Sequence, residues 1–263
     1  MDNRPIGVFD SGFGGVSVLA AAASALPEER FIYLGDNLHA PYGEHTEAEI
    51  LTYSRACVRY LIASDCKAIV IACNTATSVA AAALRKEITL PIVAMEPALK
   101  PASMVEGDGQ VLVLATEVTL KLDKFKKLMD IYGKDAVPIP APRLVTAIEA
   151  GDWEGEKVNA LLKDYLAPYL DKPVKAIVLG CTHFVFLKRA LQSFLPEHIQ
   201  LIDGNAGTAR QLKTRLLQEK LSGGVEEPDI MARVAFHSTK TGAKTLRMMR
   251  TLFDLALAQL FEA

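Results

Sequence analysis

The sequence has no excess of charge of either sign, no long apolar run and no pair of closely spaced cysteines. Its 29 Lys and Arg residues are balanced by 31 Asp and Glu residues, and no basic block stands out, which argues against a nucleic-acid or polybasic membrane surface. Its apolar runs are shorter than the ~20 residues that a membrane span requires. The segment Met1–Pro5 lacks the features of a secretory signal. We therefore expect a cytoplasmic protein with no nucleic-acid or membrane partner.

The cysteine pattern also limits the redox chemistry. The four cysteines include no CxxC spacing, so they are expected to be reduced thiols and not a disulfide framework. No histidine shows ligand spacing with a cysteine or acid, and we expect no metal site. Nor is there a pyridoxal lysine motif, so we expect no cofactor.

What the sequence does contain is a regular alternation of short apolar runs and amphipathic stretches. Strands are predicted at residues 6–9, 31–34, 68–72, 92–95, 111–114, 176–180, 199–202 and 234–236. Helices are predicted at residues 16–25, 47–63, 76–87, 120–132 and 156–170, after about 206, and from about 241. This alternation indicates βαβ units, an α/β fold and mainly parallel sheets flanked by helices.

Two strand endings are nearly identical. Lys67-Ala-Ile-Val-Ile-Ala-Cys73 recurs 108 residues later as Lys175-Ala-Ile-Val-Leu-Gly-Cys181, with five of seven residues unchanged. The following strands recur at about the same offset. The repeat predicts two similar domains related by a pseudo-two-fold axis. We place the first domain at residues 1–97 plus 207–263 and the second at residues 98–206, with a site at their interface.

The chemistry is expected at these strand ends. Cys73 and Cys181 each follow a strand and precede polar residues, which makes a core-filling role unfavourable. Cys57 and Cys66, in contrast, are predicted to pack in the core. His183, two residues after Cys181, is near enough to exchange a proton with it. Two such thiols suit the removal and return of a proton on opposite faces of one carbon.

Two carboxylates have ambiguous roles. Asp10 ends the first strand and either belongs to the site or caps the next helix. The glycine-rich turn after it does not meet the GxGxxG pattern, because Ser17 stands at the third glycine, so its amides are better suited to a carboxylate than to a dinucleotide. Glu149 either lines the site or caps the stretch before Gly151.

Four motifs, in order and spacing along nearly the whole chain, resemble those of the glutamate racemase family. They are Gly7-Val-Phe-Asp-Ser-Gly12 with Gly14-Gly15, Gly35-Asp36 with Pro41-Tyr-Gly43, Cys73-Asn-Thr75, and Gly180-Cys-Thr-His183. The resemblance implies two α/β domains with the site between them. It also implies a cofactor-independent enzyme that interconverts L- and D-glutamate and supplies D-glutamate for peptidoglycan, often as a cytoplasmic homodimer.

The resemblance assigns roles residue by residue. Cys73 and Cys181 would be the two bases, assisted by Asp10 and His183 respectively. The substrate's α-carboxylate and ammonium would be held by Ser11, Asn74, Thr75 and Thr182, and its side-chain carboxylate by Pro41, Tyr42 and Gly43. Residues near the site with less defined roles are Asp36, Thr116, Thr119 and Glu149.

The sequence departs from the family pattern in its loops. Phe184-Val185 stands where the family usually has an aromatic residue followed by proline, and Asp36-Asn-Leu-His-Ala40 replaces a more typical Asp-Thr/Ala-Arg sequence. Thr116 and Thr119 lack the glycine that the family commonly has before the second threonine. These departures affect loop shape and side-chain specificity and remove no catalytic group.

Physical chemistry supports a two-thiol site and leaves alternatives. An unperturbed thiol, with a pKa of ~8.5, is mostly protonated at neutral pH, so the starting thiolate needs help. The helix predicted after Cys73 would place partial positive charge near that sulfur. The motifs contain no arginine, so the carboxylates of the substrate would be held by neutral donors. The alternatives are a racemase for aspartate or another amino acid, and a non-catalytic protein that binds an anion or amino acid.

Overall fold

The computed structural model describes residues 1–261, which form two compact units. Unit 1 comprises Met1–Met95 and the chain from Asn205 onward, and unit 2 comprises Glu96–Gly204.

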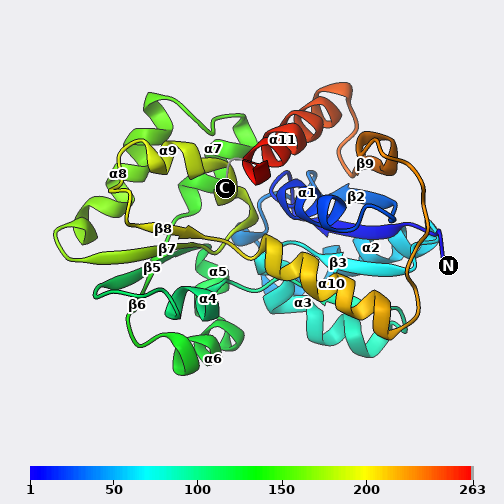
Figure 1. Cartoon of the computed structure of the whole chain (residues 1–263), viewed down its shortest axis with the longest axis horizontal. Coiled ribbons are helices and arrows are strands. Elements are labelled where there is room, and N and C mark those ends of the chain that lie inside the picture. The colour runs from blue at the N-terminus through cyan, green and yellow to red at the C-terminus, as the bar shows by residue number, and fades with distance from the viewer. Residues whose placement is uncertain (262–263) are drawn as a thin grey trace. The chain divides into compact units, whose positions relative to one another are not determined.

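Unit 1 is built on a five-stranded parallel sheet (Figure 1). Its strands are β1 (Ile6–Asp10), β2 (Phe31–Gly35), β3 (Ala68–Ile71), β4 (Ile92–Ala94) and β9 (Val234–Ser238), in the order β4-β3-β1-β2-β9. One layer of helices contains α1 (Val16–Ala25), α10 (Asn205–Gln218) and α11 (Ala243–Phe261), and another contains α2 (Glu47–Ala63) and α3 (Asn74–Glu87). The strands read as nearly continuous apolar runs because helices cover the sheet.

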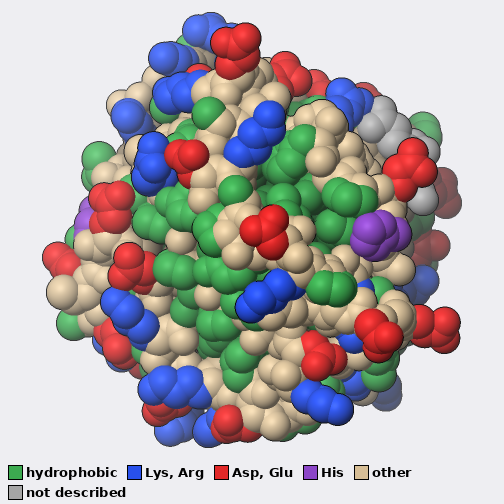
Figure 2. Space-filling view, turned by 90° about the vertical axis from the view of Figure 1, so that its left-hand side faces the viewer, with side chains coloured by type: hydrophobic (Ala, Val, Ile, Leu, Met, Phe, Trp, Pro, Cys, Tyr) green, Lys and Arg blue, Asp and Glu red, His purple; other side chains and the backbone are tan. Residues whose placement is uncertain are grey.

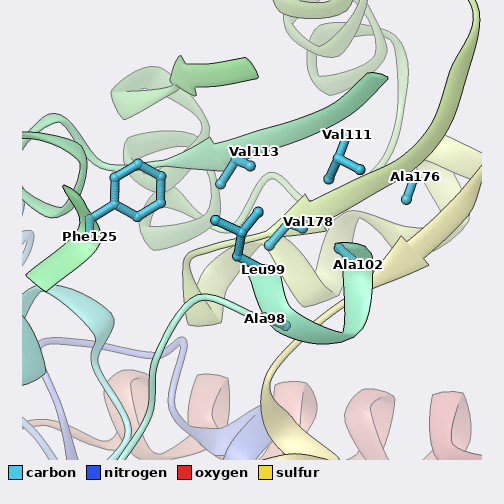
Figure 3. Packing of buried hydrophobic residues seen from close by; sticks show 8 residues of the cluster. All are labelled: Ala98, Leu99, Ala102, Val111, Val113, Phe125, Ala176 and Val178. Atoms are coloured by element: carbon cyan, nitrogen blue, oxygen red, sulfur yellow. The ribbon is translucent and has the colours of Figure 1, made fainter. Parts of the chain in front are cut away.

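Unit 2 is built on a four-stranded parallel sheet, β6-β5-β7-β8. Its strands are β5 (Gln110–Ala115), β6 (Ala136–Pro140), β7 (Val174–Leu179) and β8 (Gln200–Ile202). Figure 1 shows α4 (Leu99–Ser103), α5 (Glu117–Lys121) and α6 (Asp123–Tyr132) on one side of this sheet, and α7 (Pro142–Ala150), α8 (Glu156–Leu170) and α9 (Lys188–Gln192) on the other. Leu99 of α4 and Phe125 of α6 pack against Val113 and Val178 of the sheet (Figure 3).

The two sheets share one strand order. When the order β8-β7-β5-β6 is aligned with the order β4-β3-β1-β2, β7 corresponds to β3 and β8 to β4, as in the sequence repeat. Strand β9 is an addition at the edge of the first sheet. The α/β class and the two mainly parallel sheets are thereby confirmed. At the C-terminal end of the chain, β9 pairs with β2, and α11 packs against α1 and β9.

Two local differences from the sequence predictions have simple causes. The helix predicted at 120–132 is two helices, because Leu122 is extended (φ −78°, ψ 148°) and Thr116 caps the first of them through the amide of Thr119. Strand β6 was not predicted because it contains Pro138 and Pro140. It lies at the edge of its sheet, where a missing N–H is tolerated.

The surface carries mixed charge. On the face drawn in Figure 2, Lys and Arg side chains are interspersed with Asp and Glu and surround a central area of hydrophobic side chains. Across residues 1–261, no helix is both long and apolar enough to span a membrane.

Candidate active site

In unit 1, the predicted site residues gather at the carboxyl ends of neighbouring parallel strands. Asp10 is the last residue of β1, Asp36 follows β2, and Cys73 lies two residues beyond β3. The exposed fractions of these residues are 0, 1 and 5 % respectively. Since β2 and β3 both pair with β1, the three chain segments leave the sheet side by side.

Cys73 occupies the N-terminus of a long helix. It is the N-cap of α3, a helix of 14 residues, and its Sγ accepts the amide of Ala76 at 3.4 Å. Its thiol also lies 3.6 Å from the hydroxyl oxygen of Ser11. The helix was predicted to begin at residue 76 and begins at Asn74, because the cysteine itself caps it. The amide and the helix dipole both favour the thiolate form.

Asp10 is held by its own turn. Its Oδ1 accepts the amide of Gly12 at 2.9 Å. A Cβ on Gly15 would come within 2.5 Å of the Asp10 Cβ, so only glycine lets the turn fold this closely over the carboxylate. The N-cap of α1 is Gly15, with no side-chain cap within that helix's described residues. The observed bond of Asp10 is thus to the turn that precedes α1, and its place in the site stays a prediction.

Asn74 and Thr75 form the first turn of α3. Both are buried, with 4 % and 3 % of their surface exposed. The Asn74 Nδ2 lies 3.4 Å from the sulfur of Met95, while its Oδ1 is buried with no hydrogen-bond partner among residues 1–261. A buried amide oxygen without a donor is costly and suits a polar ligand.

The loop after β2 is organised around Asp36. Its carboxylate accepts the hydroxyls of Tyr42 and Thr239, each at 2.7 Å, and lies 2.9 Å from Nδ1 of His39. Burial, with negative neighbours that include Asp36, raises the pKa of the Tyr42 phenol, which therefore stays a donor. The sequence did not single out Thr239 or His39. Thr239 directly follows β9, and the rule that functional groups follow parallel strands could have found it.

In unit 2, three side chains form a chain of contacts. Cys181 follows β7, and its Sγ lies 3.6 Å from Nδ1 of His183. The other ring nitrogen, Nε2, lies 2.6 Å from Oε1 of Glu149 on α7. Glu149 thus contacts His183, whereas the stretch before Gly151 ends in a left-handed glycine cap.

This arrangement controls the charge of His183. Burial by itself lowers the pKa of the imidazole, but hydrogen bonds and charge from Cys181 and Glu149 more than offset it and raise the pKa well above 6.5. A protonated imidazole beside Cys181 favours the thiolate. The two thiols therefore differ: Cys73 relies on a helix N-terminus and Cys181 on an imidazolium.

The remaining predicted residues of unit 2 lie at strand ends as well. Thr116 follows β5, and its hydroxyl lies 2.9 Å from that of Thr119. Thr182 begins the short helix η2 (Thr182–Leu187) directly after Cys181 and is 2 % exposed.

The other two cysteines are buried core residues, as predicted. Burial raises the pKa of the Cys66 thiol to about 12 and also raises that of Cys57. Within the described part of the chain, no group of three or more His, Cys, Asp or Glu side chains is placed to hold a metal ion.

Comparison with known proteins decides the family. Residues 15–212 match the family model described as Asp/Glu/Hydantoin racemase. The chain belongs to this racemase family. It is an amino-acid racemase, an enzyme of the isomerase class.

Among its relatives in the racemase family, the glutamate racemase of Clostridium perfringens is 50% identical over 224 residues, which cover 84% of this chain and 86% of the relative. The fold also matches solved structures of glutamate racemases. One is the Escherichia coli enzyme in complex with L-glutamate and the activator UDP-MurNAc-ala (TM-score 0.81, 32% identity, 96% and 95% coverage). Another is the Francisella tularensis enzyme in complex with D-glutamate (TM-score 0.79, 29% identity, 98% and 95% coverage).

Proposed function

We propose that this racemase interconverts L- and D-glutamate through two bases, Cys73 and Cys181, that act on opposite faces of the α-carbon. The observation that carries the proposal is the equivalence of the two thiols. Each lies just beyond the equivalent strand, β3 or β7, of two sheets with the same strand order. The relatives named glutamate racemase support glutamate as the substrate.

The chemistry requires one thiolate and one thiol in each turnover. The thiolate takes the α-proton and becomes a thiol, and the electron pair stays on the α-carbon as a carbanion. The opposite thiol then gives its proton to the other face and becomes a thiolate. Inversion leaves the two sulfurs with exchanged protonation states, ready for the reverse reaction. Two opposed bases avoid moving one base around the carbon.

Each thiolate has its own stabilising group. The amide of Ala76 and the N-terminus of α3 serve Cys73, and His183 serves Cys181. A carboxylate near a thiol raises the thiol's pKa, so Asp10 would act by accepting or orienting a proton. Glu149 would hold the imidazole in its productive orientation.

The substrate would be held by neutral groups. The unpaired Asn74 Oδ1 is suited to the ammonium group, and the hydroxyls of Ser11, Thr75 and Thr182 to the α-carboxylate. The loop 41–43 would receive the side-chain carboxylate. Stabilisation of the carbanion would come from backbone amides and hydroxyls, without a cofactor.

The cellular role follows from the family resemblance. A glutamate racemase supplies D-glutamate for peptidoglycan, so we place the enzyme in the cytoplasm. A homodimer is the assembly that the resemblance favours, and light scattering would measure it.

Proton NMR in deuterated water tests the proposal. L- and D-glutamate would be incubated separately with wild type, Cys73→Ser, Cys181→Ser and the control Cys66→Ala, while polarimetry follows inversion. We expect deuterium at Cα and inversion in wild type and control, and a loss of at least ~10³-fold in each serine variant. Serine variants that retain the wild-type rate would exclude the two-thiol mechanism.

The same assay separates the alternatives. Exchange with aspartate and none with either glutamate enantiomer would indicate a racemase for the shorter amino acid. Binding of glutamate by calorimetry without any exchange would indicate that glutamate is a ligand of this racemase and not its substrate.

A further inference from the structure

The buried carboxylate of Asp36 joins two segments that lie some 200 residues apart in sequence. One segment is its own loop, through Tyr42 and His39. The other is the connection between β9 and α11, through Thr239. The side chain of Asp36 is only 2% exposed, so the geometry of these donors fixes it closely.

Thr239 makes three hydrogen bonds at this junction with its side chain and its backbone, and the neighbouring Ser238 makes a fourth. Its hydroxyl donates to Asp36 Oδ1 at 2.7 Å and accepts the amide of Leu38 at 3.1 Å. Its own amide donates to the carbonyl of Gly35 at 3.1 Å, and the preceding Ser238 donates its hydroxyl to Asn37 Oδ1 at 2.9 Å. The start of the loop is therefore fastened to the end of β9.

The far part of the loop depends on the same carboxylate. Tyr42, which is 1% exposed, donates its hydroxyl to Asp36 Oδ2. The ring of His39 contacts Asp36 and stacks on Tyr53 of α2 with the ring centroids 3.8 Å apart. The amide of Asp36 also donates to the carbonyl of Asp10 at 2.9 Å. A shift of Asp36 would therefore move the segment 41–43 relative to Asp10.

We propose that Thr239 is a positioning residue for substrate binding: through Asp36 and Tyr42 it sets the position of the loop 41–43. This inference rests on the proposed function, in which that loop receives the side-chain carboxylate of glutamate. The hydrogen bonds of Thr239 go to Asp36, Leu38 and Gly35 and not to the proposed bases, so its effect belongs to binding and not to proton transfer.

The hydroxyl can be removed with little change of volume. Thr239 is largely exposed although its Oγ1 turns inward, so Thr239→Val is expected to fold. Thr239→Ser restores the hydroxyl without the methyl group. Thr241→Val, at an exposed threonine two residues further along, is the matched control.

Two measurements test the inference together. Steady-state kinetics of all four proteins gives KM and kcat for both glutamate enantiomers. Amide hydrogen exchange of Leu38, Glu44 and His45 reports how firmly the loop is held, because these amides donate to Thr239, Pro41 and Tyr42.

We expect Thr239→Val to raise KM about fivefold, to leave kcat within about twofold, and to speed exchange of the three amides. Thr239→Ser and Thr241→Val should match wild type in both measurements. An unchanged KM, a fall in kcat at constant KM, or a serine variant that behaves like valine would overturn the inference.

Failure of the proposed function gives a different result. Wild type would then racemise neither enantiomer. Amide exchange would still show whether Thr239 holds the loop, and unaltered exchange in Thr239→Val would refute that part independently of activity.

Discussion

Glu149 lies 2.6 Å from His183, on the side of the imidazole opposite the thiol of Cys181. The carboxylate, the ring and the sulfur thus form one line of proton-exchanging groups within unit 2. The carboxylate fixes which ring nitrogen faces the sulfur, and it stabilises the imidazolium. For Cys73, the N-terminus of α3 stabilises the thiolate instead.

Replacement of Glu149 by glutamine tests this link directly. Loss of the negative charge removes one of the interactions that raise the pKa of His183, so the pKa should fall. NMR titration of the His183 Cε1 proton measures it, with Glu156→Gln, an exposed acid at the start of α8, as the control. We expect kcat/KM to fall together with the pKa. A pKa identical to that of wild type would contradict the assigned role of Glu149.

The pair formed by Glu149 and His183 makes the stability of the protein depend on pH in a defined direction. The pKa of His183 is raised above its ordinary value of 6.5 in the folded state. Its contribution to stability is therefore fully present below 6.5 and is lost as the pH rises through the folded pKa. The single tryptophan, Trp153, lies in unit 2 and reports urea unfolding by fluorescence. We expect wild type to exceed Glu149→Gln in stability at pH ~6, and the difference to shrink by pH ~9. A difference that grows with pH would refute this assignment.

The sequence predicted the strand-end positions of Asp10 and Cys73 for a physical reason. In a parallel sheet the chain segments that follow the strands emerge at one edge, so these two residues could be grouped from strand positions alone, whereas Asp36 came from the family resemblance. The repeat then identified Cys181 as the equivalent of Cys73. Helices 16–25, 47–63 and 156–170 were also predicted with the bounds that the structure shows. The first is Ala-rich, and the second has apolar residues at three- and four-residue spacing.

Contacts between distant segments could not be predicted in this way. Glu149 lies on α7, 34 residues before His183 in the sequence, and the sequence did not indicate which residue it contacts. The bond from Thr239 to Asp36 spans 203 positions. Such pairings are set by tertiary packing, and local propensity carries no information about them. The positions of the two thiols relative to each other remain part of the proposal.

The four thiols should differ in reactivity toward iodoacetamide. Burial raises the pKa of Cys66 to about 12 and also raises that of Cys57, so both stay protonated near pH 8. Cys73 and Cys181 each have a group that stabilises the thiolate, so peptide mapping by mass spectrometry should find them modified first. In guanidinium all four should react at similar rates. Faster modification of Cys57 than of Cys181 in the folded enzyme would disprove the assignment.

An ion pair repeated at the amino ends of the two sheets offers a matched test of stability. Lys67, directly before β3, is 0% exposed and lies 2.6 Å from Glu29, which also accepts the amide of Gly223 at 2.7 Å. In unit 2 the equivalent Lys175 lies 3.5 Å from Asp135, whose side chain is 48% exposed.

Removal of Lys67 leaves the charge of Glu29 uncompensated in the core. Removal of Lys175 leaves Asp135, whose exposed carboxylate is solvated by water. We expect Lys67→Met to lower the free energy of unfolding by about 3–5 kcal/mol, and Lys175→Met by less than about 1 kcal/mol. Urea unfolding followed by circular dichroism measures both. Adding Glu29→Met to Lys67→Met should recover part of the loss, because no charge then stays buried. Equal losses for the two lysine variants would show that burial does not set the strength of this repeated pair.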